Sequence, residues 1–198
     1  MFAFLMHPVE RAAFLYEYMK SPATTTFTNT GTQSVPSTLL EYARDRVNQL
    51  RNKKGKIGGN IKNFGVHGGV VSESGAISPQ ESNFLVRSLA QVPMDVPLHG
   101  GHVAHAEQVV RHYLLLGLME TKDQLKKSWK RIHTFFGWDG EDSCIQMFLP
   151  SLSSTRMVPL DSEEYALLAE LNEYDMMFYD SLPKVFEEQG NLPMLKGL

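Results

Sequence analysis

An unbroken apolar run opens the sequence and passes through a single turn into a helical pattern. Residues 1–6 read Met-Phe-Ala-Phe-Leu-Met, and the step His7-Pro8 follows at once. A continuous apolar run of this length is typical of a strand that is covered on both faces. Pro8 suits the first turn of a helix, where its missing N–H is not needed. The segment therefore predicts a buried strand, a tight turn and a helix, and anionic ligands bind at the carboxyl end of such strands.

Apolar and helical segments alternate along the rest of the chain. Residues 113–119 form a second apolar run, which we interpret as another buried parallel strand. Helices are predicted at 37–50, 81–90, 101–112 and 121–137, and after a cap at Asp161 or Ser162, with a kink or interruption at Pro183. This alternation favours a single α/β domain.

Size, charge and cysteine content exclude several classes of protein. The 198 residues are 42% hydrophobic, which is enough for one domain with a real core. A net charge of −3 and a pI near 6.2 argue against a general nucleic-acid binder. The single cysteine, Cys144, excludes an intrachain disulfide. Because no run approaches the length of a membrane helix and no signal pattern is present, we expect no membrane segment in this chain.

The opening segment resembles the nucleotide 3′-phosphate-binding motif of the sulfotransferase family, in particular its carbohydrate (Golgi-type) branch. The match covers residues 7–11, His-Pro-Val-Glu-Arg, and residues 15–16, Leu-Tyr. Later segments follow the family's order over most of the chain, apart from residues 44–80, which look like a basic, Gly-rich surface insertion. The resemblance implies an α/β fold with a P-loop-like three-layer parallel sheet. The N-terminal strand and loop that hold the phosphosulfate group in the family do not occur in this sequence. The resemblance therefore implies either a fragment of a longer gene product or a descendant that lost this chemistry.

Two positions of the resembling motif hold apolar residues in this chain. The family's Arg that binds the 3′-phosphate falls on Met6, and the family's Ser one helical turn later falls on Phe14. An Arg–phosphate pair is charge-assisted and often bidentate, so its loss would cost about 2–5 kcal/mol of binding. Arg11 and Arg87 are the remaining candidates for nucleotide contact. Alternatively, both form structural ion pairs or bonds to loop carbonyls.

The resemblance implies a parent activity, the transfer of a sulfuryl group from 3′-phosphoadenosine 5′-phosphosulfate (PAPS) to a carbohydrate-like acceptor in the Golgi. Because the phosphosulfate loop is missing and Met6 and Phe14 replace anion contacts, we expect this chain alone to be inactive and to bind PAPS weakly. No catalytic residue is identifiable. The alternative is a non-catalytic protein of sulfotransferase fold that binds an anionic glycan or a protein partner.

Two further clusters have a functional and a structural interpretation. The basic run from Arg44 to Lys62 is either an electrostatic lip for an anionic glycan or a solvated surface segment. His99, His102, His105 and His112 cluster in the sequence, and on a helix His102, His105 and His112 would share one flank. No cysteine or carboxylate completes a metal site at a suitable spacing, so we expect no metal.

Overall fold

The computed structural model describes residues 1–20, 36–54, 82–138 and 158–190. Of these described residues, 71% are helical. The elements in chain order are β1 (Phe2–Leu5), α1 (Pro8–Lys20), α3 (Leu39–Lys54), α4 (Phe84–Ala90), α5 (Gly100–Tyr113), β2 (Leu115–Leu118), α6 (Lys122–Phe136), α8 (Glu163–Leu171) and α9 (Glu173–Gly190).

The expected three-layer, P-loop-like parallel sheet is wrong. Within the described residues the sheet has two strands, β1 and β2, which pair in parallel from Phe2 opposite Leu115 to Leu5 opposite Leu118. The parallel pairing was expected, but the number of strands was not. The other described segments repeat their apolar residues at helical spacing. They therefore bury one stripe of a helix instead of the two faces of a strand.

Local signals set most element ends as predicted. α1 begins at Pro8, and α6 begins with a capping box between Thr121 and Gln124. α6 ends at Gly137, whose φ of 62° lies in the left-handed region that favours glycine, and Ser162 caps α8. The expected interruption at Pro183 is wrong, because α9 continues through it. Leu182, Val185 and Phe186 are buried around this proline, and such packing outweighs its cost of about 3 kcal/mol.

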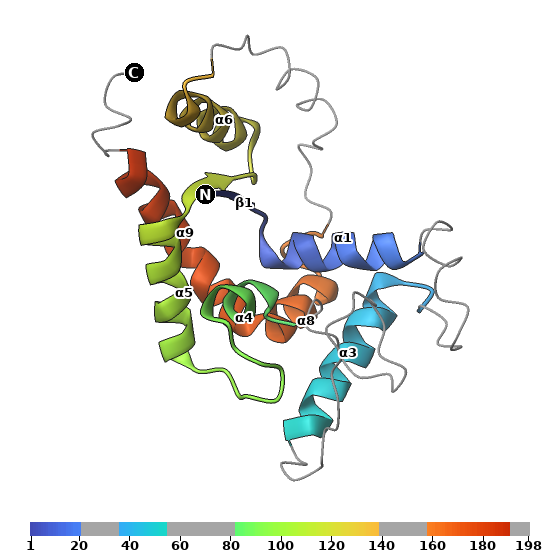
Figure 1. Ribbon diagram of the computed structural model, residues 1–198. Coiled ribbons are helices and arrows are strands. Elements are labelled where there is room, and N and C mark those ends of the chain that lie inside the picture. The colour runs from blue at the N-terminus through green and yellow to red at the C-terminus, as the bar shows by residue number, and fades with distance from the viewer. Residues whose placement is uncertain (21–35, 55–81, 139–157, 191–198) are drawn as a thin grey trace.

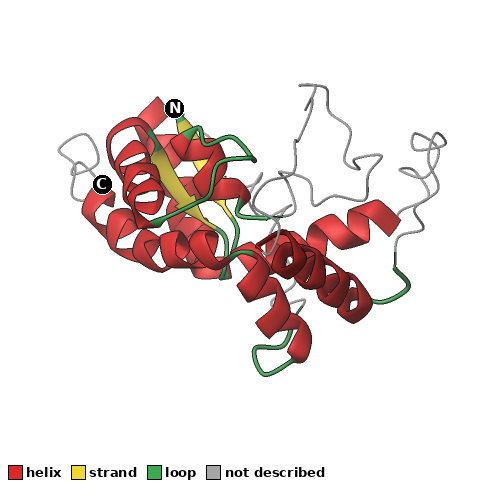
Figure 2. Ribbon diagram, turned by 90° about the horizontal axis from the view of Figure 1, so that it is seen from below, coloured by secondary structure: helices red, strands yellow, loops and turns green. Residues whose placement is uncertain are grey.

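The strand pair lies between helices on both of its faces. On one face, Phe4 and Leu115 pack with Ile132 of α6. On the other face, Leu5, Leu116 and Leu118 join the apolar residues of α5 and α9 in the largest core. Figure 1 shows α6 on one side of the strands and α5 and α9 on the other. Seen from below, both strands lie among the helices at one end of the molecule (Figure 2).

A second core holds α1, α3 and α8 together. The Tyr16 ring of α1 and the Tyr42 ring of α3 are both buried, with centroids 5.3 Å apart. Leu168 and Leu171 of α8 close this core from the other side. The two cores meet where α8 turns into α9, so that this turn connects the strand-bearing part of the molecule to its purely helical part.

The outer edge of β2 is closed by two side chains. The Leu116 N–H donates to Oε1 of Gln189 at 2.8 Å, and Nε2 of Gln189 donates to the Leu114 carbonyl at 2.7 Å. Ser128 of α6 accepts the Leu118 N–H at 2.9 Å and lies 3.2 Å from the Leu118 carbonyl. A third strand is therefore not needed on this side to satisfy the backbone.

Candidate functional site

The carboxyl end of β1, where the sequence predicted an anion site, is occupied by a histidine that caps α1. His7 is buried, and its Nδ1 accepts the Val9 N–H at 3.3 Å, which satisfies one of the free N–H groups at the helix start. The His7 ring also contacts the rings of Tyr165 and Tyr179, with centroids 6.0 and 5.2 Å away. Capping and ring packing thus determine where His7 lies.

Met6 and Phe14, at the predicted phosphate positions, form no polar site. Met6 is half-buried, and Phe14 is 57% exposed on the surface of α1. Neither side chain has a hydrogen-bond donor, so neither offers an anion a charged or polar contact.

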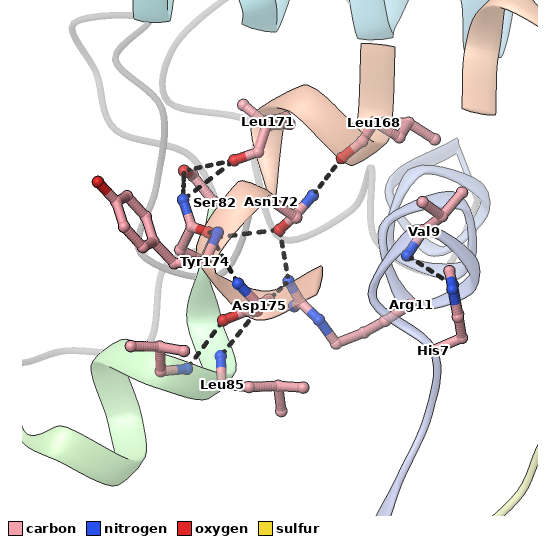
Figure 3. A network of polar contacts seen from close by, with 12 residues as sticks. His7, Val9, Arg11, Ser82, Leu85, Leu168, Leu171, Asn172, Tyr174 and Asp175 are labelled. Carbon is pink, nitrogen blue, oxygen red and sulfur yellow. Dashed lines mark hydrogen bonds and ion pairs between the residues drawn. The ribbon is translucent and has the colours of Figure 1, made fainter. Parts of the chain in front are cut away.

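Arg11 lies against the α8–α9 turn (Figure 3). One of its terminal nitrogens is 3.4 Å from Oδ1 of Asn172 and 3.9 Å from Oδ2 of Asp175, and its guanidinium covers the Phe84 ring at 5.1 Å. Burial lowers the pKa of Arg11, and the nearby Asp175 charge opposes that shift. These contacts engage the guanidinium with α4 and α9.

Asp175 caps the N-terminus of α4 from the neighbouring helix. Its two carboxylate oxygens accept the N–H groups of Leu85 at 2.9 Å and Val86 at 2.8 Å. Asn83, the N-cap residue, has a φ of 48° and provides no side-chain cap of its own. Burial raises the pKa of Asp175, while the two backbone N–H groups and Arg11 oppose that rise.

Two asparagines complete this junction reciprocally. Oδ1 of Asn172 accepts the Asn83 N–H at 3.0 Å. In return, Oδ1 of Asn83 accepts the N–H groups of Tyr174 at 2.8 Å and Asp175 at 3.1 Å. Figure 3 shows these bonds joining the start of α4 to the α8–α9 turn. The junction, defined here as Arg11, Asn83, Asn172 and Asp175, is a buried structural network.

Arg87, the second candidate cation, forms hydrogen bonds with the loop that follows α4. Its Nη1 donates to the carbonyls of Pro93 at 2.6 Å and Val96 at 3.1 Å. Burial lowers the pKa of Arg87. The structure therefore places Arg11 and Arg87 in two different sets of hydrogen bonds, although the charge of Asp175 acts on both guanidinium groups.

Two arginines of the basic run, Arg44 and Arg51, pair with acids of α8. Arg44 forms a two-point ion pair with Glu163, at 2.9 and 2.7 Å, and Arg51 forms the same pair with Glu170. The Arg44 partner lowers the pKa of Glu163. These arginines join α3 to α8 across the surface, and residues 55–62 of the run lie outside the described residues.

His99 and His102 form the capping box of α5. Nδ1 of His99 accepts the Gly101 N–H at 3.1 Å, and Nδ1 of His102 accepts the His99 N–H at 3.3 Å. Their rings lie 3.8 Å apart. Desolvation, followed by the charge of His99, lowers the pKa of His102. In the described part of the chain, no group of three or more His, Cys, Asp or Glu residues is placed to hold a metal ion.

A cluster of aromatic rings connects β1 to the end of α6. This ring cluster comprises Phe2, Phe4, Trp129, His133, Phe136 and Trp138, whose successive ring centroids lie 4.8 to 6.2 Å apart. Phe2, Phe136 and Trp138 are 42, 41 and 51% exposed, so the cluster presents apolar surface to solvent, which is typical of interaction sites. We did not predict this site; the density of aromatic residues over 129–138 was its sequence signal.

The outer edge of β1 lies beside this ring cluster, and no other described strand pairs with it. Leu115 donates its N–H to the Met1 carbonyl at 2.8 Å, which turns the backbone groups of residues 1, 3 and 5 toward β2. Because these groups alternate along a strand, the N–H and C=O of Phe2 and Phe4 point away from β2. Within the described residues no partner is found for them. In the described part of the chain, the strand pair thus has one edge closed by Gln189 and Ser128 and one edge open.

Comparison with protein-family models, with curated proteins and with solved structures gives no match to this chain. Among the described residues, no helix has the length and apolar character needed to cross a membrane.

Proposed function

We propose that this chain is a non-catalytic binding protein that recognises a protein partner by accepting an extended segment of it along the free edge of β1. The observation behind this proposal is the contrast between the two edges of the strand pair. Gln189 and Ser128 satisfy the edge of β2, whereas the edge of β1 presents backbone groups that have no partner among residues 1–20, 36–54, 82–138 and 158–190, beside exposed rings. Unpaired edges accept extended peptides through main-chain hydrogen bonds, and neighbouring side chains add specificity.

The size of this surface predicts modest affinity. Each new backbone hydrogen bond contributes about 0.5–1.5 kcal/mol, and Phe2 and Phe4 offer one N–H and one C=O each. Covering the exposed area of Phe2, Phe136 and Trp138 adds about 25 cal/mol for each Å² of apolar surface. Because association itself costs at least about 4 kcal/mol, we expect dissociation constants in the micromolar range or weaker.

The residues at the predicted nucleotide site favour a binding role over catalysis. Arg11 is engaged by Asn172 and Asp175, and Met6 and Phe14 present apolar side chains at the phosphate positions of the resembling motif. Sulfuryl transfer from PAPS to a carbohydrate-like acceptor is the second candidate, supported by the sequence resemblance. Calorimetry with adenosine 3′,5′-bisphosphate separates the two, because sub-millimolar binding to this chain would favour the transferase.

The strand-addition proposal is tested by selecting extended peptides from a random library and comparing their affinity for two variants at Phe2. The Phe2 N–H points away from β2, so Phe2→Pro removes a donor from the free edge without breaking the β1–β2 ladder. Phe2→Ala removes the same ring but keeps the N–H. We expect Phe2→Pro to weaken binding at least about fivefold more than Phe2→Ala.

Two further measurements, of amide exchange and of glycan binding, could contradict this proposal. Amide exchange of Phe2 and Phe4 should slow when a selected peptide binds, as expected for new backbone hydrogen bonds. Equal binding by Phe2→Pro and Phe2→Ala, with unchanged exchange, would contradict strand addition. If sulfated oligosaccharides bind wild type while no peptide is selected, the ring cluster is a glycan-binding surface, and the protein-partner proposal is wrong.

A further inference from the structure

The free edge of β1 has a basic border on α6. Lys122, Lys126 and Lys130 are exposed and lie four residues apart, so they follow one another along the helix surface. Within the described residues, no ion pair joins these lysines to an acidic side chain. The exposed acids nearby are Asp123 and Glu120 at the start of the helix. This row, called here the lysine row, therefore has an excess of positive charge.

Contacts of α6 show which way the lysine row faces. Trp129 packs near Phe4, and Phe136 contacts Phe2 at 5.8 Å, so this flank of α6 lies toward β1. The opposite flank lies toward α9, because Arg131 donates to the Phe186 carbonyl at 2.7 Å. Successive residues of an α-helix are rotated by about 100° around its axis, so residues three or four positions apart lie on the same flank. Lys126 and His133 therefore project beside Trp129. In Figure 1, α6 covers the strand pair on the side away from α5 and α9. The lysine row thus borders the free edge.

On the basis of the proposed function, we infer that the segment accepted by β1 carries acidic side chains on the side that faces α6. An added strand alternates its side chains between the two faces of the sheet. Residues on the α6 face would lie beside the ring cluster and the lysine row, where Glu or Asp gains an opposite charge. The other face continues the apolar core beside Leu5 and Ala3. An extended segment with alternating acidic and apolar residues fits both requirements.

Charge also argues against a second copy of this chain as the partner. Two β1 edges related by a two-fold axis through the sheet would place their α6 helices on the same face. The two lysine rows would then approach each other, and like charges at an interface disfavour association. Self-association creates this repulsion between lysine rows, whereas an acidic partner replaces it with attraction.

The test uses three extended peptides with the same alternating valines and with Glu, Gln or Lys at the other positions. Binding is followed by the fluorescence of Trp129 and Trp138, which both belong to the ring cluster. We expect affinity to fall in the order Glu, Gln, Lys, and the affinity of the Glu peptide to fall as salt rises. Lys126→Glu should weaken the Glu peptide about three- to tenfold and favour the Lys peptide.

Lys184→Glu is the matched control, since it changes net charge equally from an exposed position on α9, across the strand pair. It should leave the order of the three peptides unchanged. If the three peptides bind equally and Phe2→Pro weakens all of them, strand addition stands but the inferred acidic partner is wrong. If none of them binds, the inference is overturned as well, and the Phe2 comparison with selected peptides then decides whether strand addition itself fails.

Discussion

Replacing Asp175 by Asn should lower the free energy of unfolding by about 2–4 kcal/mol. The two carboxylate oxygens of Asp175 each accept one N–H at the start of α4, from Leu85 at 2.9 Å and from Val86 at 2.8 Å. Asparagine keeps one oxygen and turns an amide donor toward the other N–H, which leaves that group buried and unpaired at a cost of about 1–3 kcal/mol. Loss of the charge beside Arg11, 3.9 Å away, adds to the cost.

Burial of the carboxylate limits this loss. The raised pKa of Asp175 means that its charged form is less favoured in the folded protein than in the unfolded chain. Asparagine avoids that desolvation cost, so the expected loss of about 2–4 kcal/mol is somewhat smaller than the roughly 3–5 kcal/mol that is typical of breaking a buried ion pair. Asp175→Ala has no acceptor at all and should be less stable than Asp175→Asn.

Urea unfolding monitored by circular dichroism and tryptophan fluorescence measures the change, with the two probes testing two-state behaviour. Asp180→Asn is the control, because Asp180 is exposed on the same helix and should change stability by less than about 0.5 kcal/mol. An Asp175→Asn midpoint equal to that of the Asp180 variant would refute the view that this carboxylate stabilises the junction.

Three other changes test the fold. Gly117→Ala places a Cβ 2.6 Å from the Phe4 ring, so it should cost about 1–3 kcal/mol in urea unfolding, and Phe4→Leu in the same chain should recover part of the loss. Gln189→Leu leaves the edge of β2 without its side-chain partner and should cost about 2–4 kcal/mol; a Gln189→Leu variant as stable as wild type would contradict the closed edge. The pKa of His102 is lowered in the folded protein, so the unfolded chain binds a proton more readily. The contribution of neutral His102 to the free energy of unfolding should therefore be fully present above about pH 6.5 and decrease as the pH falls below that value. Replacing His99 by Asn and His102 by Gln should flatten the dependence of melting temperature on pH between about pH 8 and pH 5.

Short-range chemistry made part of this fold predictable. Pro8, Thr121 and Ser162 each act on backbone groups within a few residues, so their capping roles follow from the sequence alone. Both apolar runs became strands, as uninterrupted apolar stretches of this length often do. β2 is buried throughout, whereas β1 is only partly buried, because Phe2 is exposed. The interruption predicted at Pro183 was wrong, because the packing that stabilises α9 comes from distant residues.

The candidate site could be predicted only in part. The carboxyl end of β1 was located correctly, but the partners of Arg11 lie more than 160 positions away in the chain, and helical spacing does not indicate them. The ring cluster combines Phe2 with Phe136 and Trp138 across a similar separation. Such contacts depend on how α6 is placed over β1, which no local pattern specifies.

The sequence by itself determined where helices start and stop and which two segments become strands, because caps, turns and apolar periodicity act over one or two turns of the chain. Only the tertiary structure decided that the sheet has two strands in its described part and that Gln189 and Ser128 close one of its edges. It also decided that no described segment pairs with the other edge, that of β1, beside exposed rings. The physical reason is that backbone hydrogen bonds must be satisfied wherever the chain is buried. The packing of distant helices decides which partner each backbone group has, and it leaves the outward backbone groups of Phe2 and Phe4 without one among the described residues.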